Sequence, residues 1–323
     1  MYNILLPTGV SYYPPDRNIE HPWHQSTNGH GTVMANMISR INPYTCLEVM
    51  RIEDGIDYMP GGVSRTISAQ SAANAIEGAV LRKADIISMS WTIRNTLAKI
   101  SAHTSSINMG TYSGERKRTP DEIAIEALQT AIGSAKSSGI LMFCSAADDI
   151  QLLGKDLLPF SAAPECIFRI GAALPKGQRD PMSEDVKKIS YFFPGNQVAE
   201  ARNPRSAEPV KYHDGSSVST ALGAGLASLI MYCTNVMATY HKAKAKAHDS
   251  VTHQTFADWR ESLKIDKNMR HAFDNINDES NEDAKFLPVW TLFGDATEKI
   301  NKAQGEQKIR ELDTLVRQLC HKI

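Results

Sequence analysis

The sequence of 323 residues has no excess of charge of either sign. It carries 35 lysines and arginines against 36 aspartates and glutamates, which gives a net charge of −1. A global positive field, of the kind that attracts nucleic acid or anionic lipid, is therefore not supported. Hydrophobic residues make up 42% of the chain and charged residues 22%, which is typical of a folded globular protein.

Long apolar runs and a secretion signal are also missing. The most apolar stretch, around residues 221–232, is shorter than the roughly 18 residues that cross a bilayer. The N-terminal segment lacks a charged region before its apolar residues and becomes polar by Ser11, so no signal peptide is predicted. We therefore expect neither a membrane nor a nucleic acid among the partners.

Cysteine is scarce and shows no metal-binding or redox pattern. The five cysteines are widely spaced, odd in number and form no Cys-x-x-Cys pair. Most of them lie in apolar runs, where a free thiol behaves as a small hydrophobic group. This usage predicts a reducing compartment, and we expect a cytoplasmic protein.

Patterns that hold metals or cofactors are lacking as well. The acidic pair Glu53-Asp54 does not have the spacing of a calcium loop. His21 and His24 are better explained as parts of a surface loop than as a chelating pair. No glycine-rich phosphate loop occurs between a strand and a helix. We therefore expect no metal and no cofactor.

Strand and helix patterns alternate from His30 onward, after an irregular stretch over residues 1–28. Apolar spacing predicts helices over residues 31–40, 68–83, 121–138 and 217–232. Apolar runs predict strands over residues 47–52, 86–91, 140–145 and, more weakly, 166–171, while residues 92–120 are expected to form a polar loop. This alternation predicts an α/β fold with a parallel sheet covered on both faces.

The composition shifts after about residue 234 toward lysine, histidine, aspartate and asparagine. Near the C-terminus, Ile309, Leu312, Val316 and Leu319 recur at helical spacing. We therefore divide the chain into an α/β domain over residues 1–235 and a helical extension over residues 236–323. The apolar face of the extension is expected to pack on the body of the protein, and a dimer or partner surface is the alternative.

Three short segments at the junctions of the α/β pattern carry reactive side chains. His30 begins a helix and lies between two glycines that allow a tight turn. Ser217 lies at the start of a helix of small residues, where free N–H groups and the positive end of the dipole point outward. Asp148 follows the strand over residues 140–145, at the edge where open α/β sheets keep their sites. Taken singly, each segment is also typical of a helix cap or a turn.

The order of these segments resembles that of the subtilisin-like serine peptidases, or subtilases. His30-Gly-Thr-x-x-Ala35 is similar to their histidine motif, and Gly215-Ser-Ser-Val-Ser-Thr-Ala is similar to their nucleophile motif, Gly-Thr-Ser-Met-Ala-Thr-Pro. The strand over residues 86–91 resembles the one that pairs with substrate, and Ser145-Ala-Ala-Asp resembles an Ala-Ala-Gly-Asn segment.

The likeness covers most of residues 9–300 and is closest to intracellular fungal subtilase-like proteins. The chain shares with them a Phe-Phe-Pro-Gly stretch over residues 192–195 and a helical tail. The resemblance implies a three-layer α/β sandwich with a mostly parallel central sheet, followed by the C-terminal helical extension.

The resemblance also implies roles for individual residues. Ser217 matches the nucleophile and His30 the general base, although 187 residues separate them in the sequence. Ser90 and Trp91 match the segment that binds an extended peptide through main-chain groups. Asp148 stands where most relatives carry an asparagine that donates to the oxyanion, and only a protonated aspartate can donate there.

The acid that completes the triad in the family is not found. Relatives carry it as Asp-x-Gly at the end of the first strand, and no Asp-x-Gly precedes His30. Asp16 and Glu20 are the only acids upstream, and neither ends a strand pattern. We therefore predict that the first strand is missing. Loss of this acid lowers kcat by roughly 10⁴ in serine peptidases, or about 5–6 kcal/mol of barrier.

Three functions are compatible with this pattern. The first is a serine endopeptidase that acts on peptides or proteins through Ser217 and His30. The second is a pseudopeptidase or interaction module, favoured by the absent acid. The third uses Ser217 for acyl transfer to a substrate other than a peptide. Self-association is expected either through the C-terminal helices or through a sheet edge left open by the missing strand.

Overall fold

The computed structural model describes residues 6–15, 20–59, 62–97, 118–147, 156–180, 186–200, 209–244, 250–276 and 285–323. Its main sheet is parallel and has the strand order β10-β9-β7-β5. The four strands are β5 (Ile86–Met89), β7 (Leu141–Ser145), β9 (Ile167–Ala173) and β10 (Tyr191–Pro194). Every residue of β7 and β9 is buried, as expected for central strands of a parallel sheet.

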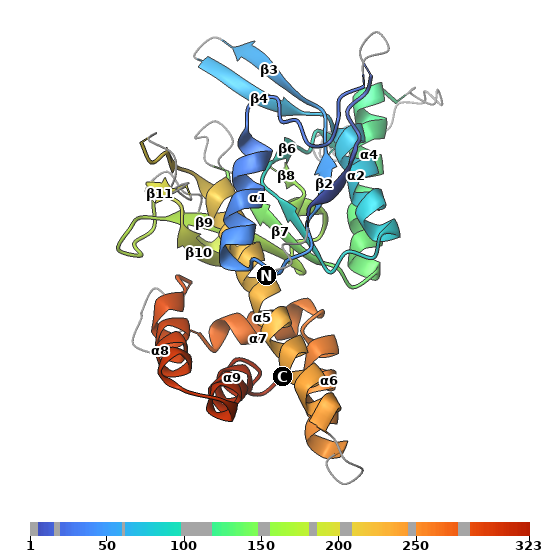
Figure 1. Cartoon of the computed structure of the whole chain (residues 1–323). Coiled ribbons are helices and arrows are strands. Elements are labelled where there is room, and N and C mark those ends of the chain that lie inside the picture. Colours follow the sequence, from blue (N-terminus) through green and yellow to red (C-terminus); the bar gives the residue numbers. More distant parts are fainter. Residues whose placement is uncertain are drawn as a thin grey trace.

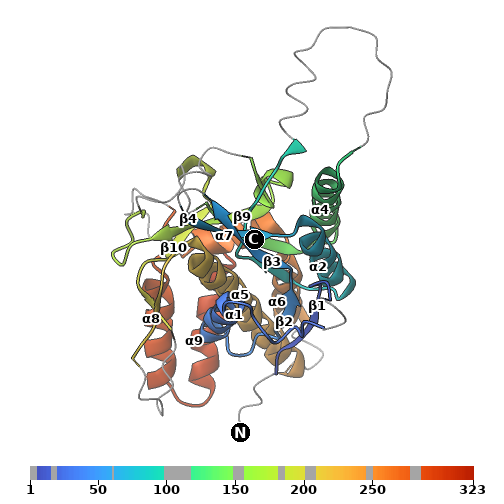
Figure 2. The same cartoon turned by 90° about the horizontal axis from the view of Figure 1, so that it is seen from above.

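Helices cover both faces of this sheet, as Figures 1 and 2 show. On one face, α2 (Ala69–Leu81) and α4 (Pro120–Ser137) form an apolar cluster with β5 and β7. On the other face, the central helix α5 (Ser216–Lys244) packs on all four strands. Helix α1 (His30–Ile41) packs in turn against α5. The expected α/β sandwich is therefore confirmed.

Local signals explain where α2 and α4 begin. Thr119 caps α4 by accepting from the N–H of Glu122, while the Glu122 carboxylate accepts from the N–H of Thr119. This reciprocal capping box satisfies two N–H groups, and Pro120 presets the first turn. Ser68 caps α2 through the N–H of Ser71. The sequence predicted both helices to within two residues.

Smaller sheets surround the main one. Strands β1 (Thr8–Ser11) and β2 (Glu48–Arg51) form a separate parallel pair. The antiparallel pairs are β3 (Asp54–Met59) with β4 (Gly62–Ile67), β6 (Ile93–Arg94) with β8 (Leu157–Leu158), and β11 (Val198–Ala199) with β12 (Tyr212–His213). Two 3-10 helices cover Phe160–Ala162 and Val186–Lys188.

In the described part of the chain, four further helices follow α5: α6 (Ser250–Ser262), α7 (Asp266–Asp274), α8 (Val289–Lys302) and α9 (Glu306–Leu319). Their apolar side chains join the cluster beneath α5 and the main sheet. The Tyr191 hydroxyl, on β10, lies 2.7 Å from Asp274 Oδ1 at the end of α7. The extension therefore packs on the body, as expected. Helix α5 runs through the predicted boundary at residue 235, and one core joins the two sides.

Helix α5 is also long and apolar enough to cross a membrane by length and composition alone. Its most apolar window of 18 residues has a mean hydropathy of 1.5, and 72% of that window is buried in the fold. The sequence showed no uninterrupted apolar run of this length, because serine, threonine and glycine are interspersed along the helix.

Four sequence-based expectations need correction. Residues 1–28 are not wholly irregular, because β1 lies within them and provides a strand before α1, although that strand carries no acid. The helix expected over residues 217–232 continues to Lys244, and the loop expected over residues 92–120 contains β6, with residues 98–117 lying outside the described part. The strand expected to be buried over residues 86–91 ends at Met89 and is only half-buried. Its position at a sheet edge explains that exposure.

Candidate active site

The start of α1 holds His30 in a fixed turn. Gly29 precedes it with φ +79°, a left-handed conformation that glycine adopts without strain. The main-chain N–H of His30 donates to the Asn28 side-chain oxygen at 3.0 Å. His30 is half-buried in the first turn of the helix. The glycine and asparagine before it therefore have a local structural role.

The start of α5 holds Ser217 in a similar way. Gly215 has φ +108°, and its N–H donates to the main-chain oxygen of Gly195 at 2.7 Å. Ser217 is half-buried in the first turn, next to the fully buried Ser216. A helix start presents free N–H groups and the positive end of the helix dipole, which favour a negative charge at this position.

Ser217 and Ser90 bind one another through both of their side chains. The Ser217 hydroxyl donates to the main-chain oxygen of Ser90 at 3.3 Å, and the Ser90 hydroxyl donates to the main-chain oxygen of Ser217 at 3.0 Å. Ser90 directly follows β5, so this pair joins the carboxyl end of the main sheet to the start of α5. The acceptor of the Ser217 hydroxyl in this structure is thus a carbonyl oxygen and not the imidazole of His30.

A second contact brings the segment before Asp148 to the same helix start. The Ser216 hydroxyl donates to the main-chain oxygen of Ala146 at 2.9 Å. Ala146 and Ala147 are both buried directly after β7. Asp148 itself lies outside the described residues, so its predicted role in the oxyanion site is not tested. The neighbouring residue Ala146 nevertheless contacts the residue before Ser217.

Helices α1 and α5 share an apolar interface close to His30 and Ser217. Met34 and Met37 of α1 form a buried cluster with Val218 and Ala221 of α5. Met34 lies one turn after His30, and Val218 immediately follows Ser217. The first turns of the two helices therefore belong to one interface, which is the packing that the predicted pairing of His30 with Ser217 requires.

Other predicted site residues have mixed outcomes. Trp91 is half-buried against the apolar cluster of α2 and α4, beside Ser90. Glu20 is exposed, and no hydrogen bond or ion pair joins it to His30. Asp16 lies outside the described residues. The third member of a triad is thus not identified among these two acids.

Sequence reasoning missed two residues that stabilise the first turns of α5, where Ser217 lies. The Ser219 hydroxyl donates toward the main-chain oxygens of Phe193 and Pro194 at 3.0 and 3.1 Å, and the Thr220 hydroxyl donates to the Ser216 oxygen at 2.7 Å. Both side chains are fully buried. Ser219 therefore anchors the start of α5 to the end of β10, while Thr220 bonds within the helix.

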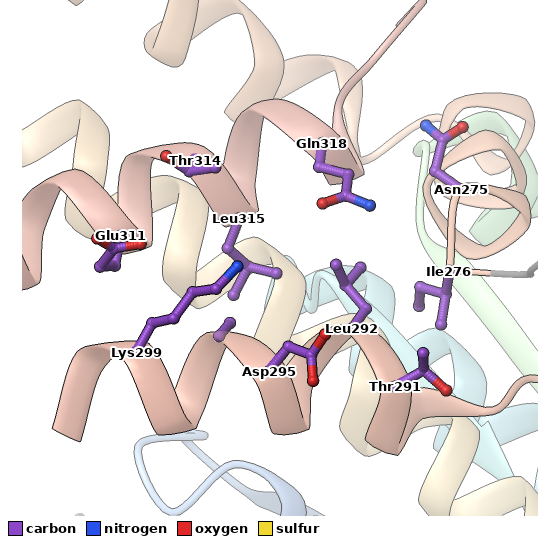
Figure 3. Close-up of a pocket in the computed structure, with 11 residues that line it drawn as sticks. Asn275, Ile276, Thr291, Leu292, Asp295, Lys299, Glu311, Thr314, Leu315 and Gln318 are labelled. Atoms are coloured by element: carbon purple, nitrogen blue, oxygen red, sulfur yellow. The ribbon is translucent and has the colours of Figure 1, made fainter. Parts of the chain in front are cut away.

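A separate groove lies between α8 and α9, as Figure 3 shows. It has a volume of about 470 Å³ and is lined by residues of these helices and of the turn after α7, including Asp295, Lys299 and Glu311. None of the predicted site residues lines it. Among the described ranges, no three histidine, cysteine, aspartate or glutamate side chains are grouped as metal ligands.

Several solved protease structures resemble this fold. A mutant of the protease domain of PatA has 15% identity and a TM-score of 0.54, with 90% of this chain and 88% of that chain covered. A lanthipeptide protease has 15% identity and a TM-score of 0.53, with coverage of 88% and 80%. The self-cleaved protease domain of PatA has 16% identity and a TM-score of 0.50, with coverage of 88% and 93%. At such identities the likeness defines the fold alone, which is that of a subtilisin-like protease.

The family follows from the sequence match. Residues 9–279 match the model of the subtilase family, peptidase S8, and the chain belongs to this family. A search of curated proteins gave no match. The family assignment agrees with the resemblance found in the sequence, while the intracellular fungal subtype stays a prediction.

Proposed function

We infer that the protein is a serine endopeptidase in which Ser217 is the nucleophile and His30 the general base. Membership of the subtilase family supports hydrolysis of peptides or proteins. The observation that carries the residue assignment is the place of Ser217: half-buried in the first turn of α5, held to the end of β5 and next to the interface with α1. Serines in a structural cap need none of these three relationships.

The reaction follows from this arrangement. The Ser217 hydroxyl turns from the Ser90 carbonyl oxygen toward His30, which takes its proton as the oxygen attacks the peptide carbonyl carbon. The negative charge on the carbonyl oxygen is stabilised by the main-chain N–H of Ser217 and by protonated Asp148. His30 then gives the proton to the leaving amine, and water hydrolyses the acyl-enzyme. Ser90 and Trp91 bind the extended substrate on one side.

One observation favours a second function, that of a pseudopeptidase or interaction module. The Ser217 hydroxyl donates to a carbonyl oxygen rather than to an imidazole nitrogen. Hydrogen bonds of catalytic groups often form only with substrate bound, so this geometry does not exclude activity. A module of this kind would bind peptides without cleaving them.

Peptide hydrolysis by purified variants tests the proposal. Wild-type protein should cleave an unfolded protein substrate, while Ser217→Ala and His30→Gln should each lower the rate by at least about a hundredfold. Ser137→Ala, at an exposed position near the end of α4, is the matched control and should cleave at the wild-type rate. Absence of cleavage by the wild-type protein at every pH would support the interaction module instead.

A further inference from the structure

The β10–β11 connection, residues 195–197, lies against the loop that precedes helix α5. The Gly215 N–H donates to the main-chain oxygen of Gly195 at 2.7 Å. Asp214 contacts the same connection through its side chain, because its Oδ1 accepts from the main-chain N–H of Gln197 at 2.5 Å. The side-chain amide of Gln197 also donates to Asp214 Oδ2 at 3.3 Å. Two successive residues before α5 are therefore bonded to this connection.

Gln197 has a backbone conformation that is unfavourable for a residue with a side chain. Its φ is +52°, in the left-handed region, where Cβ lies too close to the main chain. Such a conformation persists only where the surrounding structure fixes it. The hydrogen bonds from the main-chain and side-chain N–H groups of Gln197 to Asp214 provide that constraint.

The bonding of Asp214 differs from that of an ordinary helix cap. A capping side chain accepts from N–H groups in the first turn of its own helix. Asp214 lies two positions before Ser216, the first residue of α5, and within the described ranges its side chain binds Gln197 and no N–H of that helix. Its role is therefore to join two loops and not to begin α5.

The strand that follows the connection contacts helix α1, which carries His30. Arg40, in the last turn of α1, donates through Nη1 to the main-chain oxygen of Ala199 at 2.5 Å. Val198 packs against the apolar cluster that α1 and α5 share. Strand β11 thus contacts both helices that carry the proposed base and nucleophile. A displacement of the turn at Gln197 would move this strand relative to the start of α5.

We propose that Asp214 is a positioning residue for peptide hydrolysis, which holds Gln197 in its left-handed turn and so fixes the loop before Ser217 relative to α1. The proposal rests on the assignment of Ser217 as nucleophile and His30 as base. The Asp214 carboxylate acts through the main chain and transfers no proton. A displacement of about 1 Å between reacting groups can cost about a hundredfold in rate. Loss of Asp214 should therefore lower kcat more than it changes KM.

Steady-state kinetics with an unfolded protein substrate test this role. Asp214→Ala should lower kcat by about tenfold or more and change KM by less than about twofold. Asp214→Asn keeps a side-chain oxygen that accepts the Gln197 N–H, so it should retain at least about half of the wild-type kcat. Asp121→Ala removes an exposed carboxylate from the first turn of α4 and is the matched control, with the wild-type kcat. An unchanged kcat in Asp214→Ala, or equal losses in Asp214→Ala and Asp214→Asn, would overturn the proposal.

A double variant separates this role from a general effect on stability. Glycine adopts a positive φ without strain, so Gln197→Gly does not need the support of Asp214. In the Gln197→Gly background, Asp214→Ala should therefore lower kcat by less than about twofold, against about tenfold in the wild-type background. Equal losses in the two backgrounds would mean that Asp214 does not act through this turn, and the proposal would be wrong.

Amide hydrogen exchange distinguishes failure of this proposal from failure of the proposed function. A wild-type protein that neither cleaves peptides nor reacts with a fluorophosphonate would overturn the assignment of the nucleophile, and exchange alone would then decide whether Asp214 holds the loop. In Asp214→Ala the amides of Gln197 and Gly215 should exchange at least about tenfold faster than in the wild-type protein. Unchanged exchange at Gly215 would overturn the proposal whether or not the protein is active.

Discussion

Ser90 and Ser217 hold each other across 127 residues of sequence, each hydroxyl donating to the main-chain oxygen of the other. The two hydrogen bonds join the carboxyl end of a central strand to the first turn of the central helix. Because the Ser217 hydroxyl takes part, the contact that positions this proposed nucleophile also engages its hydroxyl proton. In the proposed reaction, the Ser217 hydroxyl must leave the Ser90 oxygen and turn toward His30 before attack.

Ser90→Ala is expected to destabilise the fold by about 1 kcal/mol, because it removes one hydroxyl donor and leaves the Ser217 oxygen without it. It should also lower kcat for peptide hydrolysis, since Ser217 is less firmly placed. Urea unfolding and steady-state kinetics measure the two effects. Ser88→Ala is the control, because Ser88 lies on the same strand and makes no side-chain hydrogen bond within the described residues. Identical kinetics for the two variants would mean that Ser90 does not position the nucleophile.

Gly195→Ala is expected to destabilise the protein by about 1–3 kcal/mol, because the new methyl group has no space. Its Cβ would lie 2.6 Å from the Cβ and 2.9 Å from the Cα of Ala172, and it would overlap the Ser219 hydroxyl. Gly133→Ala is the matched control within α4, where nothing lies within 4 Å of the added carbon. Alanine in a helix should stabilise that site by about 0.5–1 kcal/mol. The midpoint temperature of thermal unfolding should fall in Gly195→Ala and rise in Gly133→Ala. A shift of both midpoints in the same direction would be inconsistent with this packing.

Tyr191→Phe is expected to destabilise the contact between β10 and α7 by about 1.5–3 kcal/mol, because its hydroxyl donates to the Asp274 carboxylate. Burial, and then the charge of Asp274, raises the pKa of Tyr191 far above its ordinary value of 10. Above about pH 10 the unfolded tyrosine loses its proton while the folded one keeps it, so stability falls as the pH rises. Below that pH, Tyr191 contributes its full stabilisation to the folded state.

Unfolding free energies of wild-type protein and Tyr191→Phe, measured between about pH 8 and pH 11, test this assignment. The loss of stability with rising pH should be shallower in the variant. Burial also raises the pKa of Cys233 to about 11 and that of Cys320 to about 12. These thiols steepen the alkaline decline equally in both proteins, so the difference isolates Tyr191. Parallel pH profiles would contradict its role.

Asp148→Asn is expected to broaden the pH–rate profile toward higher pH. An aspartate can donate to the oxyanion only while it is protonated, so hydrolysis by the wild-type protein should be faster at mildly acidic pH. Asparagine donates at every pH in this range. The measurement is kcat/KM against pH for both proteins, and superimposable profiles would remove Asp148 from the oxyanion site.

Much of the sandwich could be predicted because its signals are local. Pro120, Glu122 and Gly139 mark the ends of α4, and apolar runs mark β7 and β9. Strand β1 could not be predicted, because it is short, only partly buried and stabilised by pairing with β2. Thr8 pairs there with Glu48, which lies 40 residues further along the chain. Within the described residues β5 pairs only with β7, and its place at the end of the sheet is likewise a property of the strand order and not of the run Ile-Ile-Ser-Met itself.

The candidate site also has one part that could be predicted from the sequence and another that could not. His30 and Ser217 stand in motifs that can be read along the chain, because glycines and small residues surround them. Their supports, Ser216 and Ser219, bind carbonyl oxygens of Ala146 and of the end of β10, which are distant in sequence. No spacing rule reveals such partners, since any buried serine can donate to a carbonyl oxygen that the fold brings near.

Covalent labelling with a fluorophosphonate, followed by mass spectrometry of the modified peptide, tests the central claim most directly. The account predicts a single phosphonyl group on Ser217, no labelling of Ser217→Ala, and labelling slowed at least about a hundredfold in His30→Gln. Ser137→Ala should label as the wild-type protein does. Labelling of a residue other than Ser217 would contradict the assignment of the nucleophile. Labelling of Ser217 at the wild-type rate in His30→Gln would contradict the assignment of the base.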